Sequence, residues 1–137
     1  MSVASAIKNN RPSRQQCIVA QSVLHRFDHP TAEMVWLTAR RRDAKISLAT
    51  VYRNLEKLVD DGKIDKFAVH GEADHYEPNT ADHIHARCTN CQQIFDINFN
   101  LTRRVGNKVR REIGFEVDGC QIMADGLCKK CNNKVRK

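Results

Sequence analysis

The stretch His83-Ile84-His85-Ala86-Arg87-Cys88-Thr89-Asn90-Cys91 carries two kinds of metal ligand within nine positions. Residues i and i+2 of an extended strand lie on the same face, so His83 and His85 present both imidazoles to one point. Cys88 and Cys91 form a separate CxxC pair at a spacing typical of zinc ligands. The stretch therefore predicts one strand and turn that serve both a nitrogen and oxygen site and a sulfur site.

A second CxxC pair, Cys128 and Cys131, follows the first pair after 36 intervening residues. Four thiolates complete a tetrahedral zinc coordination and leave no open position, which is typical of a structural rather than a catalytic site. The alternative is two unrelated pairs of buried cysteines. The spacing favours a structural Zn²⁺ site.

The two histidines need oxygen partners, which Glu77 and Asp96 can supply from the preceding segment and from the next strand. His29 is a more distant candidate. Three imidazoles and two carboxylates suit Fe²⁺ or Mn²⁺ better than a thiolate set does, although Zn²⁺ and Co²⁺ can also enter such a site. From spacing alone, His83 and His85 are equally compatible with two ordinary surface or core histidines. Spacing does not select His29 at all.

The composition places the chain among globular proteins. Of its 137 residues, 41% are hydrophobic and 28% are charged, which fits one domain or two small domains with a shared core. The first ten residues lack the apolar run of a signal peptide, and nowhere do 18 apolar residues follow one another, so we expect a cytoplasmic protein outside the membrane. The net charge of +7 suits a polyanionic partner such as DNA.

Caps and apolar residues at helical spacing predict three helices in the N-terminal half. They begin at Ser13, Thr31 and Ser47, and the inner face of the first one extends to Phe27. A hairpin with strands at 63–69 and 75–77 follows. This order is that of a winged helix-turn-helix, and the third helix leaves Thr50, Tyr52 and Arg53 outside its apolar stripe, facing outward.

The second half reads as a small α/β domain. We expect strands at 83–87, 93–97, 115–117 and 121–123, a helix at about 101–113, and a frayed tail at 132–137. The chain is thus an α+β protein with two domains, 1–79 and 80–137. Residues 1–12 form a loose arm that offers Lys8 and Arg11 to a phosphate backbone.

Five strings in this order resemble the ferric uptake regulator family over nearly the whole chain. The resemblance implies a homodimeric, metal-dependent, DNA-binding repressor with an N-terminal winged helix and a C-terminal α/β dimerisation domain. The strings are His29-Pro-Thr-Ala-Glu33, Ile46-Ser-Leu-Ala-Thr-Val-Tyr-Arg-Asn-Leu55, His83-x-His85-x-x-Cys88-x-x-Cys91, Gly114-Phe-Glu-Val117 and Gly126-Leu-Cys128-x-x-Cys131.

The resemblance also assigns the sites. It implies structural zinc at the four cysteines and a regulatory Fe²⁺ or Mn²⁺ site at His29, Glu77, His83, His85 and Asp96. A two-fold dimer should read an inverted-repeat operator in double-stranded DNA. The expected DNA contacts are Arg11, Ser47, Thr50, Tyr52 and Arg53.

Asp96 in the last ligand position resembles the peroxide-sensing branch, whereas Glu77 in place of Asp points towards iron-sensing members. In peroxide sensors the ferrous form reacts with H₂O₂ and a ligand histidine is oxidised, so the matching targets are His29 and His83. Iron-responsive and zinc-responsive repressors are the alternatives. A non-haem iron enzyme is a different-class alternative, but the outward Tyr52-Arg53 pair and the five-ligand count argue against an enzyme.

Overall fold

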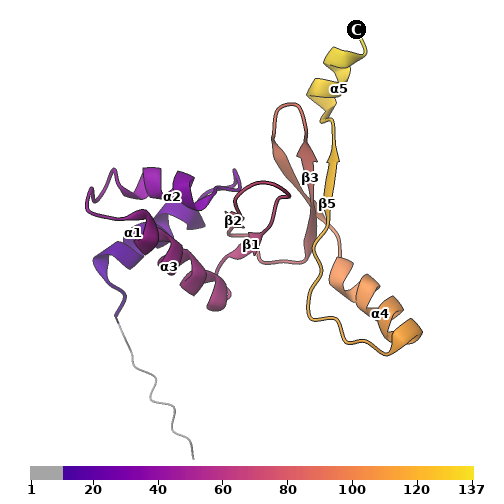
Figure 1. Cartoon of the computed structure of the whole chain (residues 1–137), viewed down its shortest axis with the longest axis horizontal. Coiled ribbons are helices and arrows are strands. Elements are labelled where there is room, and N and C mark those ends of the chain that lie inside the picture. The colour runs from indigo at the N-terminus through magenta and orange to yellow at the C-terminus, as the bar shows by residue number, and fades with distance from the viewer. Residues whose placement is uncertain (1–10) are drawn as a thin grey trace, which may run out of the picture.

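The computed structural model describes residues 11–137, so Lys8 lies outside the described residues. The N-terminal domain contains helices α1 (Arg14–Leu24), α2 (Ala32–Ala39) and α3 (Leu48–Asp60), followed by strands β1 (Asp65–Phe67) and β2 (His75–Glu77). β1 and β2 pair antiparallel and form the wing (Figure 1). Three helices followed by this hairpin confirm the winged helix-turn-helix.

Each of the three helices starts at its predicted cap. Ser13 accepts a hydrogen bond from the Gln16 N–H, while the Gln16 side chain accepts one from the Ser13 N–H at 2.8 Å. Such a reciprocal capping box satisfies two backbone donors that a helix start otherwise leaves unpaired. Thr31 and Ser47 cap α2 and α3 more simply, since each side-chain oxygen accepts a hydrogen bond from the backbone N–H of Met34 or Thr50, respectively.

The hydrophobic core lies between the three helices and the wing. Its buried members come from the three helices, from the segments that flank α3 and from β2; they are Ile18, Val19, Val23, Ala32, Val35, Ala39, Ile46, Val51, Leu55, Ile64 and Tyr76. The prediction for Phe27 is wrong, because its side chain is 85% exposed. α1 ends at Leu24, so the chain has already left the helical register when it reaches Phe27.

The C-terminal domain is built on a three-stranded sheet. It contains β3 (His83–Cys88), β4 (Ile94–Asn98), α4 (Leu101–Ile113), β5 (Met123–Gly126) and α5 (Lys129–Val135). The strand order is β4-β3-β5, with β3 antiparallel to β4 and parallel to β5. Together with the winged helix, this small α/β unit gives the expected α+β fold.

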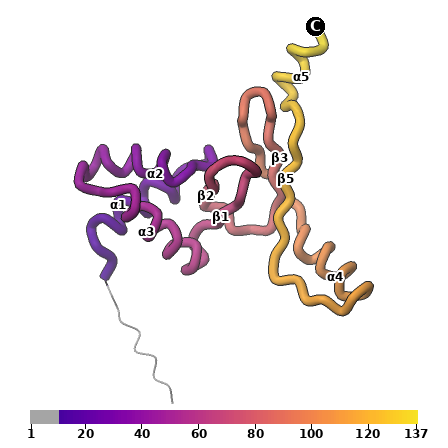
Figure 2. Tube along the Cα trace, viewed as in Figure 1, coloured from indigo at the N-terminus to yellow at the C-terminus, as the bar shows by residue number. Residues whose placement is uncertain are grey.

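The two faces of this sheet have different chemistry. His83, His85 and Arg87 share one face of β3, and Asp96 joins them because it pairs with His85. The opposite face is apolar and consists of Ile84, Ala86, Phe95 and Ile97. The trace in Figure 2 shows that the wing of the N-terminal domain lies beside β3. One face of the sheet therefore meets the N-terminal domain, and the other presents apolar side chains.

Three predictions in this half are wrong in detail. Residues 115–117 form no strand, because this segment pairs with no strand of the described chain and leaves Phe115 57% exposed. The last strand runs from Met123 to Gly126, not from 121 to 123. The tail is not frayed from 132, because α5 extends to Val135 and is anchored through the buried Cys131. No helix of the described residues is long and apolar enough to cross a membrane.

Candidate metal centres

The four CxxC cysteines meet at one end of the C-terminal domain. Cys88 ends β3, Cys91 lies in the following turn, and Cys128 and Cys131 form the start of α5. Their sulfur atoms all lie within 4.8 Å of one another. The Cys91 and Cys128 Sγ atoms are 3.9 Å apart, which is far beyond a disulfide bond. Sulfurs about 2.3 Å from a tetrahedral zinc ion stand about 3.8 Å apart, so this spacing fits zinc.

The electrostatics of this cluster also favour a cation. Backbone N–H groups of Cys128 and Cys91 lower the pKa of Cys88 to about 6. At Cys91 the N–H of Gln93 acts in the same direction, but the neighbouring sulfurs of Cys88, Cys128 and Cys131 outweigh it and raise the pKa to about 11. The Cys88 thiolate thus forms readily, and the neighbouring sulfurs oppose the ionisation of Cys91. A divalent cation removes that opposition, which is why thiolate formation and metal binding are coupled.

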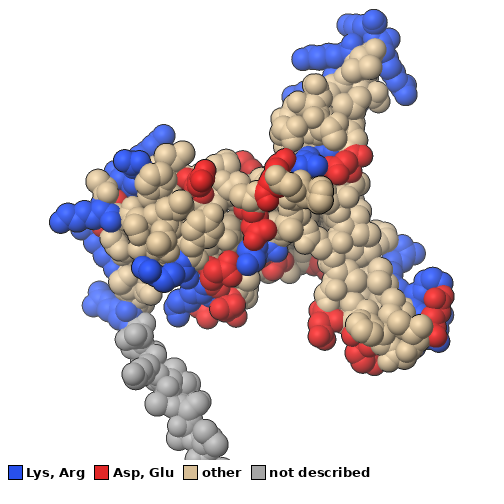
Figure 3. All heavy atoms as spheres, viewed as in Figure 1, with Lys and Arg blue, Asp and Glu red and all other residues tan. Residues whose placement is uncertain are grey.

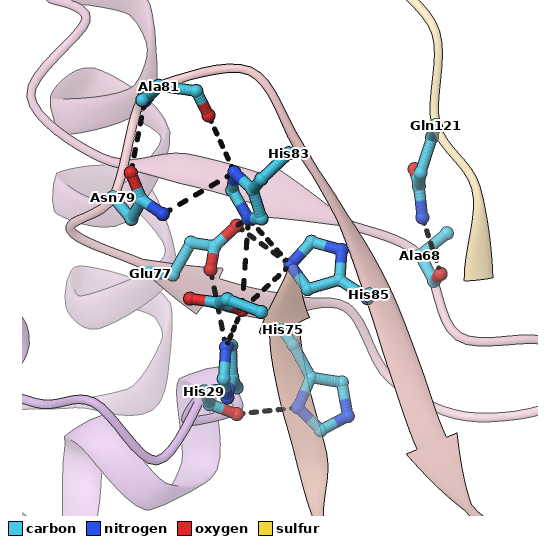
Figure 4. Close-up of polar contacts among 10 residues, drawn as sticks. His29, Ala68, His75, Glu77, Asn79, Ala81, His83, His85 and Gln121 are labelled. Atoms are coloured by element: carbon cyan, nitrogen blue, oxygen red, sulfur yellow. Dashed lines mark hydrogen bonds and ion pairs between the residues drawn. The ribbon is translucent and has the colours of Figure 1, made fainter. Parts of the chain in front are cut away.

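The second cluster gathers side chains from both domains (Figure 4). His29 lies between α1 and α2, Glu77 ends β2, His83 and His85 lie on β3, and Asp96 lies on β4. Ligand atoms of His29, Glu77, His85 and Asp96 all lie within 4.8 Å of one another. The structure therefore brings together all five residues that sequence reasoning proposed, since His83 Nε2 also lies 2.8 Å from Glu77 Oε1.

The shortest contact across the domain boundary joins His29 Nε2 to Asp96 Oδ1 at 2.6 Å. Glu77 Oε1 lies 3.0 Å from His85 Nε2. His83 Nε2 and His85 Nε2 are only 2.9 Å apart, so at most one proton can lie between these two nitrogens. Nitrogen and oxygen lone pairs thus converge on a small volume, which is the arrangement of a site for a divalent cation.

Hydrogen bonds outside the cluster orient its ligands. His83 Nδ1 donates to the carbonyl of Ala81 at 2.6 Å, which assigns the ring proton to Nδ1 and directs the Nε2 lone pair at the cluster. Glu77 Oε2 is buried and makes no hydrogen bond among the described residues, although His29 Nε2 lies 3.3 Å away. A buried carboxylate oxygen without a donor costs free energy, and a bound metal ion satisfies it.

The carboxylates dominate the charge of the cluster. Burial by itself raises the pKa of Glu77, but the neighbouring imidazoles of His29 and His85 outweigh it and lower the pKa to about 2. Burial lowers the pKa of His29, yet the neighbouring carboxylates of Glu77 and Asp96 reverse that effect and raise the pKa above its ordinary value. Glu77 is therefore ionised at neutral pH, and the cluster attracts positive charge in the form of protons or a metal ion.

Strand β2 holds His29 in an unusual backbone conformation. The φ of His29 is +52°, a left-handed value that is uncommon in a non-glycine residue and costs free energy. His75 Nδ1 donates to the His29 carbonyl at 2.6 Å, and the Tyr76 N–H donates to the Pro30 carbonyl at 2.9 Å. The wing thus fixes the loop between α1 and α2, which presents His29 to the cluster.

Sequence reasoning missed two side chains that support this cluster. Phe67 stacks on His85 with ring centroids 3.9 Å apart, and it also stacks on His75 with ring centroids 5.6 Å apart. The available signal was weak. His75 lies two residues before Glu77 on the same strand, and Phe67 is its partner in the β1–β2 register.

Two pockets border the cluster. One of about 680 Å³ is lined by Glu77, His83, His85 and Cys120, and another of about 660 Å³ is lined by His29 and His75. Among residues 11–137, only the two clusters bring three or more His, Cys, Asp or Glu ligand atoms within 4.8 Å. Cys120 belongs to neither cluster. The pockets give small molecules access to the mixed cluster from two sides.

The proposed DNA contacts lie on and before α3. Ser47 Oγ lies 2.9 Å from Thr50 Oγ1, and Arg53 Nη2 donates to the same Thr50 oxygen at 3.1 Å. Tyr52 is 41% exposed, and Arg11 is exposed as well. Figure 3 shows Lys and Arg side chains over the helices of the N-terminal domain and acidic side chains near its junction with the C-terminal domain. The exposed face of α3 can therefore approach a polyanion.

A winged helix-turn-helix whose wing and helix loop share a ligand cluster with a second domain defines a metal-responsive regulator. The chain belongs to the ferric uptake regulator family, whose sequence pattern matches residues 8–124. The peroxide operon regulator of Bacillus subtilis is 26% identical over 124 residues, which are 90% of this chain and 86% of that protein.

Solved structures agree with this assignment. The Campylobacter jejuni peroxide stress regulator is 30% identical, with a TM-score of 0.69 over 85% of this chain and 88% of that chain. The Helicobacter pylori ferric uptake regulator, at 21% identity, has a TM-score of 0.72 over 89% of this chain and 82% of that chain. At that identity the second likeness establishes the fold alone.

Proposed function

We propose that this protein is a metal-dependent, DNA-binding transcriptional repressor that senses peroxide through Fe²⁺ or Mn²⁺ at the mixed cluster. The observation that carries the proposal is the 2.6 Å contact of His29 Nε2 with Asp96 Oδ1, because it joins the helix-turn-helix domain to the C-terminal domain. A metal ion held by ligands from both domains fixes their relative orientation. That orientation is the two-state element that a regulatory response requires.

The regulatory ligands in this proposal are His29, Glu77, His83, His85 and Asp96. Bound Fe²⁺ would activate the O–O bond of peroxide, and either His29 or His83 would be oxidised by two electrons overall. One peroxide oxygen would enter that imidazole at a ring carbon, and the other would leave as water. An oxidised His29 no longer fits beside Asp96. The N-terminal domain is then free to leave the orientation that fits the operator. The peroxide-named relatives in B. subtilis and C. jejuni support this branch.

The sulfur cluster has a structural role in this proposal. Zn²⁺ held by Cys88, Cys91, Cys128 and Cys131 has no open position for a substrate. It ties the end of β3 to the start of α5, two segments far apart in the sequence. We place the domain boundary between residues 79 and 80, so that zinc stabilises the C-terminal domain alone.

The apolar face of the sheet supports a homodimer. Phe95 is 38% and Ile97 is 40% exposed, and both lie on the face opposite Asp96. A second copy of the chain that covers this face brings two α3 helices to two half-sites, so the operator is an inverted repeat. α3 enters the major groove in this arrangement. Its contacts come from Ser47, Thr50, Tyr52 and Arg53, with Arg11 at phosphate or the minor groove.

Iron sensing is the second candidate, and the observation that favours it is Glu77 in the ligand set. A zinc-responsive repressor of the same family ranks behind it. An enzyme is a weaker interpretation, because five protein ligands leave little open coordination at the metal and the exposed face of α3 has no role in turnover.

The deciding experiment compares the Fe²⁺ and Mn²⁺ forms after exposure to H₂O₂. Peroxide sensing predicts that only the Fe²⁺ form loses operator binding irreversibly, and that mass spectrometry finds one added oxygen on His29 or His83. Asp96→Glu should keep metal-dependent operator binding and lower the peroxide sensitivity, because it changes the geometry without removing a ligand. Unmodified histidines with full operator binding after peroxide would replace this proposal with iron sensing, for which chelation alone releases DNA.

A further inference from the structure

A second contact between the two domains lies beside the metal cluster. Arg87 follows His83 and His85 at alternate positions of β3, so all three side chains point to the N-terminal domain. The Arg87 Nη1 atom lies 2.8 Å from Glu72 Oε1, in the loop between β1 and β2. This ion pair therefore joins the same two domains as the metal ligands, and it does so without a metal ion.

The geometry makes this pair more ordered than an ordinary surface ion pair. Arg87 Nε lies 2.8 Å from Asp125 Oδ1 on β5, and Arg87 and Asp125 are partners in the parallel register. The Arg87 side chain is only 14% exposed. Because Asp125 already fixes the guanidinium, Glu72 docks against it at a small cost in side-chain entropy.

Glu72 also connects to the loop that carries His29. Glu72 Oε2 lies 3.6 Å from His75 Nε2, and the other nitrogen of His75 donates to the His29 carbonyl at 2.6 Å. The path from Arg87 through Glu72 and His75 therefore ends on the backbone of a regulatory ligand. A change in the Arg87–Glu72 contact can therefore shift the position of His29 in the metal-free protein.

We propose that Arg87 and Glu72 form a metal-independent latch that favours the closed arrangement of the two domains and so sets how much metal the regulatory cluster needs. The latch deepens the proposed function and rests on it. A cluster that is complete only in the closed arrangement binds metal with an apparent affinity reduced by the closed fraction. Loss of the latch lowers that fraction and weakens metal binding, while saturating metal restores the closed arrangement.

The test measures Mn²⁺ binding to the zinc-loaded protein without DNA, by the EPR signal of free Mn²⁺. Glu72→Gln should weaken Mn²⁺ binding about two- to fivefold, the range of a partly exposed ion pair. Its operator affinity at saturating Mn²⁺ should stay within about twofold of the wild type. Glu116→Gln, which removes the Arg110–Glu116 pair inside the C-terminal domain, is the matched control and should leave Mn²⁺ binding unchanged.

A double-mutant cycle with Arg87→Gln separates the latch from a general effect of Glu72 on His75. The latch requires that Glu72→Gln adds nothing further when Arg87 is already replaced. Circular dichroism of each variant establishes that it is folded. Wild-type Mn²⁺ affinity in folded Glu72→Gln, or full additivity in the double variant, would overturn the latch. Failure of the proposed function looks different, because wild-type operator binding would then be independent of Mn²⁺.

Discussion

The two domains differ in how they bury apolar surface. The buried core cluster of the described chain lies entirely between Ile18 and Tyr76, within the N-terminal domain. In the described residues beyond 80, the buried hydrophobic side chains are Cys88, Leu101 and Cys131, and two of these three are proposed zinc ligands. Large apolar side chains of the same domain are exposed; they are Phe95, Ile97, Ile113, Phe115, Ile122, Leu127 and Val135.

This difference shows what each domain needs in order to fold. Burial of a large apolar side chain contributes roughly 1.5–3 kcal/mol, so the N-terminal core can sustain its fold alone. The C-terminal domain has few such contributions, so we expect it to draw stability from zinc and, in the proposed homodimer, from the second copy of the chain. The mixed metal cluster lies where the N-terminal domain, which has its own core, meets the C-terminal domain, which has little core. In the proposed function, the metal that reports the signal therefore also restrains the less stable half.

Zinc removal should have the largest effect, and it should act on the C-terminal domain alone. Structural zinc sites contribute about 10–16 kcal/mol of apparent binding free energy in small domains. We expect Cys131→Ser, or extraction of zinc by a strong chelator, to unfold the C-terminal domain and leave the N-terminal helices folded. Limited proteolysis with mass spectrometry checks this, since the protected fragment should end near residue 79.

The wild-type protein should also hold one zinc ion per chain through dialysis against a mild chelator. Cys120→Ser is the matched control, because Cys120 lies outside both clusters. A metal-free wild type that remains a folded dimer would show that the C-terminal domain does not depend on zinc.

The apolar sheet face gives the next largest effect. Ile97→Asp places a charge on the face opposite the metal cluster, and we expect it to cost at least about 2 kcal/mol of dimer stability. Analytical ultracentrifugation should detect monomers at concentrations where the wild type is dimeric. Operator binding should fall, because a monomer reads one half-site only.

Leu55→Ala is the counterpart in the N-terminal core, where Leu55 is fully buried. It should lower the free energy of unfolding by about 2–5 kcal/mol without changing the dissociation of the dimer. If the N-terminal domain folds on its own core and the C-terminal sheet face forms the interface, Ile97→Asp acts on association and Leu55→Ala acts on folding. A dimer of unchanged affinity in Ile97→Asp would remove this sheet face from the interface.

Local sequence signals were sufficient for much of this fold. Ser13, Thr31 and Ser47 marked the helix starts, and the helix predicted at 101–113 agrees with α4. Capping and helical periodicity act over a few neighbouring residues, so they can be read without a tertiary structure. The four cysteines were recognisable for the same reason, since CxxC spacing is local.

Long-range placement was not available from local signals. His29 and Asp96 are 67 positions apart, and only the family resemblance brought His29 into the ligand set. The strand expected at 115–117 failed because a strand needs a partner, and its apolar pattern says nothing about whether one lies nearby. Phe67 and His75 support the cluster through stacking and a backbone carbonyl, which leave no motif in the sequence.

Replacement of Tyr52, on the exposed face of α3 in the N-terminal domain, should have the smallest effect. Tyr52 lies on α3 and is 41% exposed, while Val51 and Leu55 on the same helix are fully buried. Replacement of Tyr52 by Ala should therefore leave the free energy of unfolding nearly unchanged and cost about 1–3 kcal/mol of affinity for the cognate operator, because an aromatic ring can contact a thymine methyl group. Fluorescence anisotropy with operator and with random DNA measures both affinities.

The contrast between the two DNAs decides what Tyr52 does. If Tyr52 reads a base, Tyr52→Ala reduces operator affinity more than random-DNA affinity, whereas removal of a phosphate-binding side chain affects both alike. Tyr52→Phe is the matched control, because it keeps the ring and should retain most of the preference for the operator. Arg11→Ala, at an exposed position before α1, should weaken binding to both DNAs by a similar factor if this side chain contacts phosphate. Equal reductions on operator and random DNA in Tyr52→Ala would assign this side chain to the phosphate backbone and leave base recognition to Arg53.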